Sequence, residues 1–160
     1  MSNVRMGRYA IAYDELVVGQ RYEGSARTLT QTDLSLACML SGDWHPIHAD
    51  VEFCRAAGMP GPMFQGPYGI LLAMGMATQL PVFADPVVGA TGLAQWRYRR
   101  PLRVGDTVHV RATINGKRVT SDGQRAIVDR RFELLGPDGE SFQEGYGGTM
   151  LRLSSRGEQS

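Results

Sequence analysis

The fold of this chain is decided by the segment Pro67-Tyr68-Gly69-Ile70-Leu71-Leu72-Ala73-Met74-Gly75-Met76-Ala77, which from Ile70 onward is apolar on every side of a helix. Pro67 suits the first turn of such a helix, because its missing N–H would have no intrahelical partner there. Pro81 then ends the helical pattern. A helix without a polar face should be buried, so we expect a helix from Pro67 to Leu80 with other elements wrapped around it. We expect Met74 and Met76 to fill the core, although a flexible wall for a ligand tunnel is the alternative.

Strand-like runs lie on both sides of this helix. An earlier run, Tyr22 to Thr30, precedes it, and four follow it: Val87 to Tyr98, Thr107 to Lys117, Arg125 to Leu135 and Glu144 to Leu153. Turn signals rich in Gly, Asp and Pro separate the last four runs. This order predicts an α+β fold in which an antiparallel sheet wraps around the central helix.

Two shorter helices are predicted between the first strand and the central helix. Thr30-Gln31-Thr32-Asp33 has the pattern of a capping box before the apolar stretch Leu34 to Leu40, and Ser41-Gly42 ends that helix. A polar loop from Asp43 to Asp50 follows. It leads to a second helix in which Phe53, Cys54 and Ala57 share a face and which Gly58 ends.

The composition is that of one globular domain. The chain has 160 residues, 42% of them hydrophobic and 21% charged, and its 17 Lys and Arg residues nearly balance its 16 Asp and Glu residues. We therefore expect a single domain over residues 1–160, with an ordered core of about 9–153, and no nucleic-acid surface.

Localisation follows from what the chain does not contain. The segment 1–13 has no apolar core of signal-peptide length, and no apolar run is long enough to span a bilayer. Cys38 and Cys54 sit at apolar helix positions, so we interpret them as buried thiols. These features predict a cytoplasmic protein that does not enter a membrane.

The densest group of reactive side chains is Ser41-Gly42-Asp43-Trp44-His45-Pro46-Ile47-His48-Ala49-Asp50, in the loop between the two short helices. Asp43 and His48 are five positions apart, with Pro46 stiffening the chain between them, and both can point at one water molecule. Such a pair suits general acid/base catalysis. The alternative is that Asp43, His45, His48 and Asp50 bind zinc or iron.

Other residues near the loop have ordinary structural interpretations. Asp50 suits the N-cap of the second helix better than a catalytic role. Trp44 is expected to fill core volume rather than to cover a ligand. His109 lies within a predicted strand and is expected to be structural.

A basic stripe covers the end of the predicted strand Val87 to Tyr98 and the residues after it. Trp96 and Tyr98 alternate with Arg97 and Arg99, and Arg100 and Arg103 follow. The stripe is either an ordinary solvated face or a site for phosphate groups, which arginine binds in bidentate fashion.

The loop resembles the motif of the MaoC-like dehydratase family, the (R)-specific enoyl-CoA hydratases, which reads Ser-Gly-Asp-x-Asn-Pro-Ile/Leu-His. The likeness continues in Leu16-Val17-Val18-Gly19-Gln20, in Ala57 to Gly66, and in Tyr98-Arg99-Arg100-Pro101-Leu102-Arg103-Val104-Gly105-Asp106-Thr107. The resemblance implies a hotdog fold, a homodimer joined edge to edge, and catalysis by Asp43 and His48. It also implies an acyl-CoA thioester as substrate, with coenzyme A as part of that substrate and with no separate cofactor or metal.

Two positions depart from the family pattern. His45 replaces the usual Asn, and Gln65-Gly66-Pro67 replaces the usual His-Gly-Met. Family members bring the N–H of this glycine to the thioester carbonyl. Because Pro67 has no N–H, the donor here has to be Gly66 or Tyr68, at a helix N-terminus whose dipole favours negative charge.

The residues expected to contact substrate follow from these positions. They are His45, Gln65 and Tyr68 near the acyl group, and Arg99 and Arg100 near the nucleotide of coenzyme A. Gln65 either binds a polar acyl substituent or only caps the helix or fixes the loop. The departures favour a short, branched or polar acyl group.

The predicted reaction is reversible hydration of a 2-enoyl thioester to a (3R)-hydroxyacyl thioester, with Gly66 holding the enolate. The alternatives are a hotdog thioesterase and a non-catalytic acyl-CoA-binding protein. Hotdog thioesterases generally carry a carboxylate on the central helix, and Pro67 to Leu80 contains no Asp or Glu. The loop therefore favours the hydratase.

Overall fold

A computed structural model of the chain describes residues 10–80 and 85–153. Its elements follow in the order η1 (Tyr13–Glu15), β1 (Arg21–Glu23), β2 (Arg27–Thr28), α1 (Gln31–Ser41), α2 (Pro46–Ala49), α3 (Val51–Ala56), α4 (Gly66–Ala77), β3 (Val87–Tyr98), β4 (Thr107–Val119), β5 (Arg125–Leu135) and β6 (Ser141–Arg152). The predicted α+β class is confirmed.

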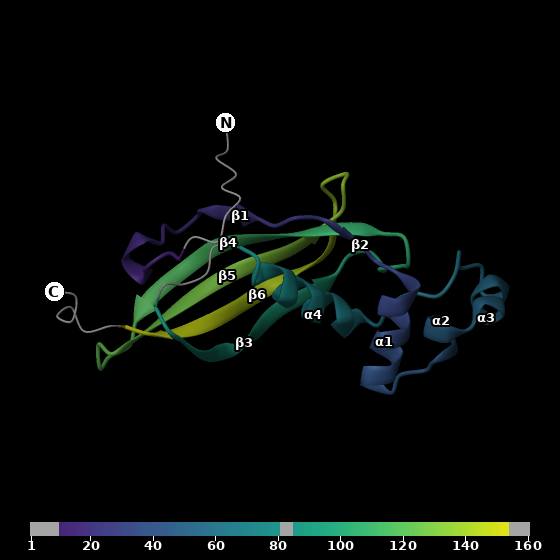
Figure 1. Cartoon of the computed structure of the whole chain (residues 1–160), viewed down its shortest axis with the longest axis horizontal. Coiled ribbons are helices and arrows are strands. Elements are labelled where there is room, and N and C mark those ends of the chain that lie inside the picture. The colour runs from purple at the N-terminus through teal and green to yellow at the C-terminus, as the bar shows by residue number, and fades with distance from the viewer. Residues whose placement is uncertain (1–9, 81–84, 154–160) are drawn as a thin grey trace.

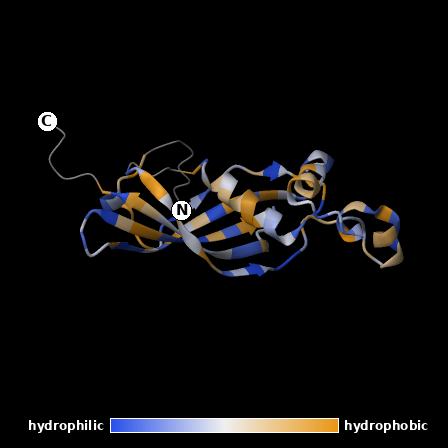
Figure 2. Ribbon diagram, turned by 90° about the horizontal axis from the view of Figure 1, so that it is seen from below, coloured by the Kyte–Doolittle hydropathy of each residue, from blue (hydrophilic) through white to orange (hydrophobic). Residues whose placement is uncertain are grey.

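The strands form one six-stranded antiparallel sheet in the order β1-β4-β5-β6-β3, with β2 pairing beside β1 on β4. The sheet curves around α4, while α1, α2 and α3 lie together at one end of the molecule (Figure 1). Hydrophilic and hydrophobic residues alternate along the long strands (Figure 2), as expected for a sheet with one buried face.

The main core fills the space between α4 and the sheet. It contains Leu72, Ala73 and Met76 of α4, together with Val108 and Val110 of β4 and other buried side chains. Met76 therefore lies in the core as predicted, and Met74 packs partly buried against it. A smaller cluster around Tyr13, Leu16 and Val128 closes the other end of the sheet.

The first strand is shorter than predicted. The single strand expected from Tyr22 to Thr30 is two short strands, β1 and β2, separated at Gly24. The Gly24 N–H donates to the Val110 carbonyl, and a Cβ on Gly24 would lie 3.3 Å from the Val110 side chain. Gly24 therefore keeps the register of β1 against β4, and the register shifts by one residue before Arg27 pairs with Val108, which divides the predicted strand in two.

The central helix begins one residue before Pro67 and ends at Ala77. Pro81, which we expected to end it, lies outside the described residues. The expectation that every side of α4 is buried is wrong for one face, because the Leu71 side chain is 63% exposed.

The second predicted helix is confirmed as α3, although only Cys54 on its predicted apolar face is buried. Phe53 is exposed, so the shared face does not form a core contact. The predicted polar loop from Asp43 to Asp50 also contains α2, which begins at Pro46. Cys38 and Cys54 are buried free thiols, as predicted. Within the described residues, no helix is long and apolar enough to cross a membrane.

Candidate active site

The loop that carries Asp43 begins where α1 ends. Gly42 adopts a left-handed conformation with φ of 71°, and its N–H donates to the Cys38 carbonyl at 2.9 Å. A residue other than glycine is strained in this conformation, because it carries a Cβ. The Ser41 hydroxyl donates to the Ala37 carbonyl at 2.6 Å and accepts from the Asp43 N–H at 3.2 Å. The Ser-Gly pair therefore turns the chain and fixes the backbone of Asp43.

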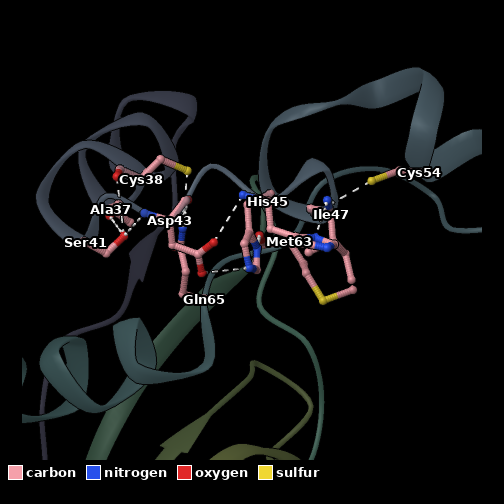
Figure 3. Close-up of polar contacts among 10 residues, drawn as sticks. Ala37, Cys38, Ser41, Asp43, His45, Ile47, Cys54, Met63 and Gln65 are labelled. Carbon is pink, nitrogen blue, oxygen red and sulfur yellow. Dashed lines mark hydrogen bonds and ion pairs between the residues drawn. The ribbon is translucent and has the colours of Figure 1, made fainter.

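The two carboxylate oxygens of Asp43 have different surroundings. Oδ1 accepts the backbone N–H of His45 at 3.1 Å, which closes a tight turn (Figure 3). Oδ2 lies 3.4 Å from Nε2 of His48. The Asp43 side chain is 45% exposed and that of His48 is 12% exposed, so the pair sits at the protein surface with the imidazole on its inner side. The structure thus brings together the two residues predicted to act as an acid/base pair.

The contacts of His48 define which of its nitrogens carries hydrogen. Nδ1 lies 2.6 Å from the carbonyl oxygen of Met63, and a carbonyl oxygen can only accept. Nδ1 is therefore protonated, and in a neutral imidazole the lone pair is on Nε2. That lone pair faces Oδ2 of Asp43, which is also an acceptor. A water molecule can satisfy both atoms by donating one hydrogen to each.

Gln65 joins this loop to the start of α4. Its Nε2 donates to the backbone carbonyl of Asp43 at 3.0 Å and to Sγ of Cys38 at 3.3 Å, and the residue is 6% exposed. The side chain makes no capping bond to α4. Of the two structural roles predicted for Gln65, the structure therefore shows fixation of the loop and not helix capping.

Gly66 supplies the free N–H at the start of α4. The Tyr68 N–H donates to the Gln65 carbonyl at 3.0 Å, whereas no described atom of the protein accepts from the Gly66 N–H. Of the two donors left open by the sequence, Gly66 is thus the one available to a ligand. A Cβ at this position would lie 3.1 Å from the ring of Tyr98, so glycine permits the close approach of β3.

Gln143 of β6 is a site residue that the sequence did not reveal. Its Nε2 donates to the Gly66 carbonyl at 3.0 Å, and its Oε1 accepts from the Trp96 indole at 2.9 Å. A Cβ on Gly69 would lie 2.2 Å from this Nε2. Gly69 therefore makes room for the amide that orients the Gly66 peptide. The only sequence signal for this contact was Gly69 itself, because a glycine within an apolar helix often marks a position where another group packs closely.

A cavity of about 550 Å³ lies beside these residues, between α1 and α4. Asp43, Gln65 and Tyr68 line it together with the aliphatic side chains of Leu36, Leu40 and Leu71. Its size and lining are typical of a site for a small apolar ligand with a few polar groups.

The other residues predicted to contact substrate do not line this cavity. The Nδ1 of His45 accepts from the Ile47 N–H at 3.3 Å and so caps α2, a role that the family's Asn can also fill. Arg99 pairs with Glu144 at 2.7 Å. Arg100 pairs with Asp138 and stacks over Phe142, so both guanidinium groups bind acidic partners of the same chain.

The remaining predictions near the loop have mixed outcomes. The Oδ1 of Asp50 accepts from the Phe53 N–H at 2.9 Å, so its capping role is confirmed. The prediction that Trp44 fills core volume is wrong, because its side chain is 56% exposed. The turn that fixes Asp43 points Trp44 outward. His109 lies within β4, opposite Leu135, as expected of a structural residue.

No group of three or more His, Cys, Asp or Glu side chains in the described residues is arranged to hold a metal ion.

Comparison with known proteins places this geometry in a family. The model of the MaoC like domain matches residues 15–131. Enoyl-CoA hydratase 2 of Arabidopsis thaliana is 30% identical over 66% of the chain, which spans 33% of that protein's length. The solved R-hydratase from Pseudomonas aeruginosa is 25% identical, with a TM-score of 0.62 over 92% of this chain and 94% of its own. A Mycobacterium tuberculosis protein with a double hotdog fold matches 94% of this chain with 47% of its own, at a TM-score of 0.79 and 22% identity. The last match confirms the hotdog fold.

Proposed function

We propose that this chain, which belongs to the MaoC-like domain family, reversibly adds water to a 2-enoyl thioester and forms a (3R)-hydroxyacyl thioester. The observation that carries the proposal is the pairing of Asp43 Oδ2 and His48 Nε2 at 3.4 Å, with Nδ1 of His48 committed to the Met63 carbonyl. These two acceptors suit one water molecule between them. The name and structure of the hydratase relatives support the same reaction.

The proposed reaction proceeds in two proton transfers. The oxygen of the bound water attacks C3 of the enoyl group while one of its protons passes to the Asp43/His48 pair. The electron pair of the double bond moves to C2 and onto the thioester oxygen, where the Gly66 N–H stabilises the enolate. The pair then delivers a proton to C2, so that one water molecule has been added in total. Dehydration is the same path reversed.

The roles of Asp43 and His48 differ at the start of the reaction. The lone pair on Nε2 makes neutral His48 able to accept the proton, and the ionised Asp43 holds the water and stabilises the imidazolium that forms. Gln65 and Gln143 are positioning residues, since one binds the Asp43 carbonyl and the other binds the Gly66 carbonyl.

The test is an assay of purified protein with short, medium, long, branched and dicarboxylic 2-enoyl-CoAs, read as loss of the conjugated thioester absorbance. Chiral analysis of the product reports the configuration at C3. Release of free thiol without hydration would instead identify a thioesterase. Binding without either reaction would identify a non-catalytic acyl-CoA-binding protein.

A chelator separates the acid/base mechanism from a metal mechanism. Full hydratase activity should survive extensive treatment with a strong chelator, because the pair activates water and Gly66 polarises the carbonyl. Loss of activity that zinc or iron restores would show that the proposed roles are wrong.

The proposed assembly is a homodimer joined through β3. This strand pairs with β6 on one side, no described residue pairs with its other edge, and it exposes Val87, Val88 and Leu93. A free edge of this length and apolarity is suited to pairing with a second copy. Light scattering coupled to gel filtration would show a dimer for the wild type and a monomer when Leu93→Lys is introduced. A monomeric wild type would contradict the assembly.

A further inference from the structure

The polar side chains that line the α1/α4 cavity have no unused hydrogen-bond donor. The Ser41 hydroxyl donates to the Ala37 carbonyl at 2.6 Å. The Tyr68 hydroxyl donates to Oδ1 of Asp33 at 3.3 Å. Burial raises the pKa of Tyr68, and the Asp33 charge raises it further, so this hydroxyl keeps its proton. A ligand in the cavity therefore finds no free hydroxyl donor.

The amide of Gln65 is also committed. Both of its hydrogens are used, since Nε2 donates to the Asp43 carbonyl and to Sγ of Cys38. The amide cannot be turned over, because its oxygen would then face the Asp43 carbonyl. Its Oε1 is buried and has no hydrogen-bond partner. Gln65 thus offers the cavity no free donor.

The remaining polar groups of the lining are carboxylates. Burial raises the pKa of Asp33, but hydrogen bonds from Arg27 and Thr30 outweigh it and lower the pKa to about 2. Arg27 Nη2 lies 2.5 Å from Oδ2 of Asp33, and Arg27 is not part of the lining. Asp43 adds the second carboxylate. Of the backbone donors beside the cavity, the Gly66 N–H is reserved for the thioester carbonyl.

We propose that the acyl group held in this cavity is uncharged and ends in a hydrocarbon, and that the same chain ending in a carboxylate is rejected. This inference rests on the proposed function, because it assigns the substrate class of the same site. A ligand carboxylate that enters the cavity would lose its hydration water. It would then lie among hydrogen-bond acceptors, the carboxylate of Asp43 and aliphatic side chains, none of which can donate a hydrogen bond to it. Leu36, Leu40 and Leu71 would instead contact a hydrocarbon chain.

The first test compares trans-2-pentenoyl-CoA with the same five-carbon chain whose terminal methyl is a carboxylate. The methylene between the alkene and the carboxylate keeps the reacting groups similar, so the ratio of kcat/KM reports the cavity. We expect the wild type to prefer the methyl-ended chain by at least about 100-fold. A preference of less than tenfold would overturn the inference while leaving the hydratase function intact.

The second test places a cation in the cavity. Leu71→Arg should move the ratio toward the carboxylate-ended chain by roughly tenfold or more, because a guanidinium can bind the new carboxylate. Leu71→Gln is the control, since it changes length and polarity without charge. Leu36→Arg tests the same wall from α1 in case Leu71→Arg disturbs folding, which circular dichroism would report. If neither arginine moves the ratio more than Leu71→Gln does, the acyl chain does not bind here.

Binding of unreactive analogues separates this inference from the proposed reaction. Calorimetry with pentanoyl-CoA and glutaryl-CoA compares the same two chain ends without an alkene. Tighter binding of pentanoyl-CoA by at least about 100-fold supports the substrate class even if no enoyl-CoA is hydrated. Equal binding overturns it.

Discussion

Two regions of the molecule, the sheet of β4, β5 and β6 and the loop from Ser41 to His48, differ in what holds their residues in place. The sheet is fixed by continuous backbone pairing and by side chains such as Val108, Val128 and Leu134, which are fully buried. The loop is fixed by single hydrogen bonds from Gly42, His45 and Gln65, and Asp43 is half exposed. The reacting side chains of the loop can therefore be removed with little loss of stability, whereas removal of a buried side chain of the sheet should be costly.

The largest expected effect is at the Asp43/His48 pair. Asp43→Asn and His48→Ala should each lower turnover by roughly 10²–10⁴-fold, because they remove a proton transfer rather than packing. The free energy of unfolding, measured in urea, should change by only about 1 kcal/mol. The double variant should lose much less than the product of the two effects, since both residues act on one water.

Asp50→Asn is the matched control for this pair. It makes the same chemical change two residues from His48, and asparagine also caps helices well. Turnover should be close to that of the wild type. If Asp43→Asn or His48→Ala kept near-normal activity, or if Asp50→Asn lost as much as they do, the acid/base assignment would be wrong.

The sheet should respond in the opposite way. Leu134→Ala in β5 should lower the free energy of unfolding by about 2–5 kcal/mol, because it removes a fully buried side chain and leaves a cavity. The folded fraction should keep turnover near the wild-type value. Val119→Ala, at an exposed position of β4, is the control and should be nearly neutral. Loss of turnover in folded Leu134→Ala would show that the two regions are coupled.

The sequence predicted the sheet in more detail than the contacts of the loop. Alternation and turn signals were enough for the long strands, and β3 and β5 have the predicted bounds. The motif predicted that Asp43 and His48 lie together, and Oδ2 and Nε2 are 3.4 Å apart. The motif was not enough for Gln143 or for the tautomer of His48, because both depend on contacts between segments far apart in the chain. The prediction that Trp44 fills core volume was wrong for a related reason. The hydrophobicity of a residue does not determine the direction in which a turn points its side chain.

A smaller effect is expected at Gly69 of α4, which packs against Gln143 of β6. Gly69→Ala would place a Cβ 2.2 Å from Nε2 of Gln143 and so displace the amide from the Gly66 carbonyl. Turnover should fall by about tenfold with KM less affected, and stability should fall by about 1–3 kcal/mol. Gly75→Ala is the control in the same helix, because nothing lies within 4 Å of its Cβ, and alanine there should be neutral or stabilising. Equal effects of the two variants would contradict the positioning role of Gln143.

The smallest effect concerns the start of α1, where a charged network holds the helix that leads into the loop. The Asp33 carboxylate accepts from the Thr30 N–H at 2.7 Å and pairs with Arg27, and its pKa in the folded protein is about 2 against an ordinary value of 3.8. A carboxyl group whose pKa is lowered by folding stabilises the folded state above the ordinary value. That stabilisation is lost as the pH falls through the folded-state pKa. Asp33→Asn should therefore cost about 1 kcal/mol of unfolding free energy at pH 7, because it removes the ion pair with Arg27. The difference from the wild type should shrink between pH 4 and pH 2 as the wild-type carboxylate takes up its proton. Urea unfolding of both proteins across this range measures the difference directly. A gap between wild type and Asp33→Asn that stays constant down to pH 2, or that widens, would show that the network stabilises α1 by packing and not by the ionised carboxylate.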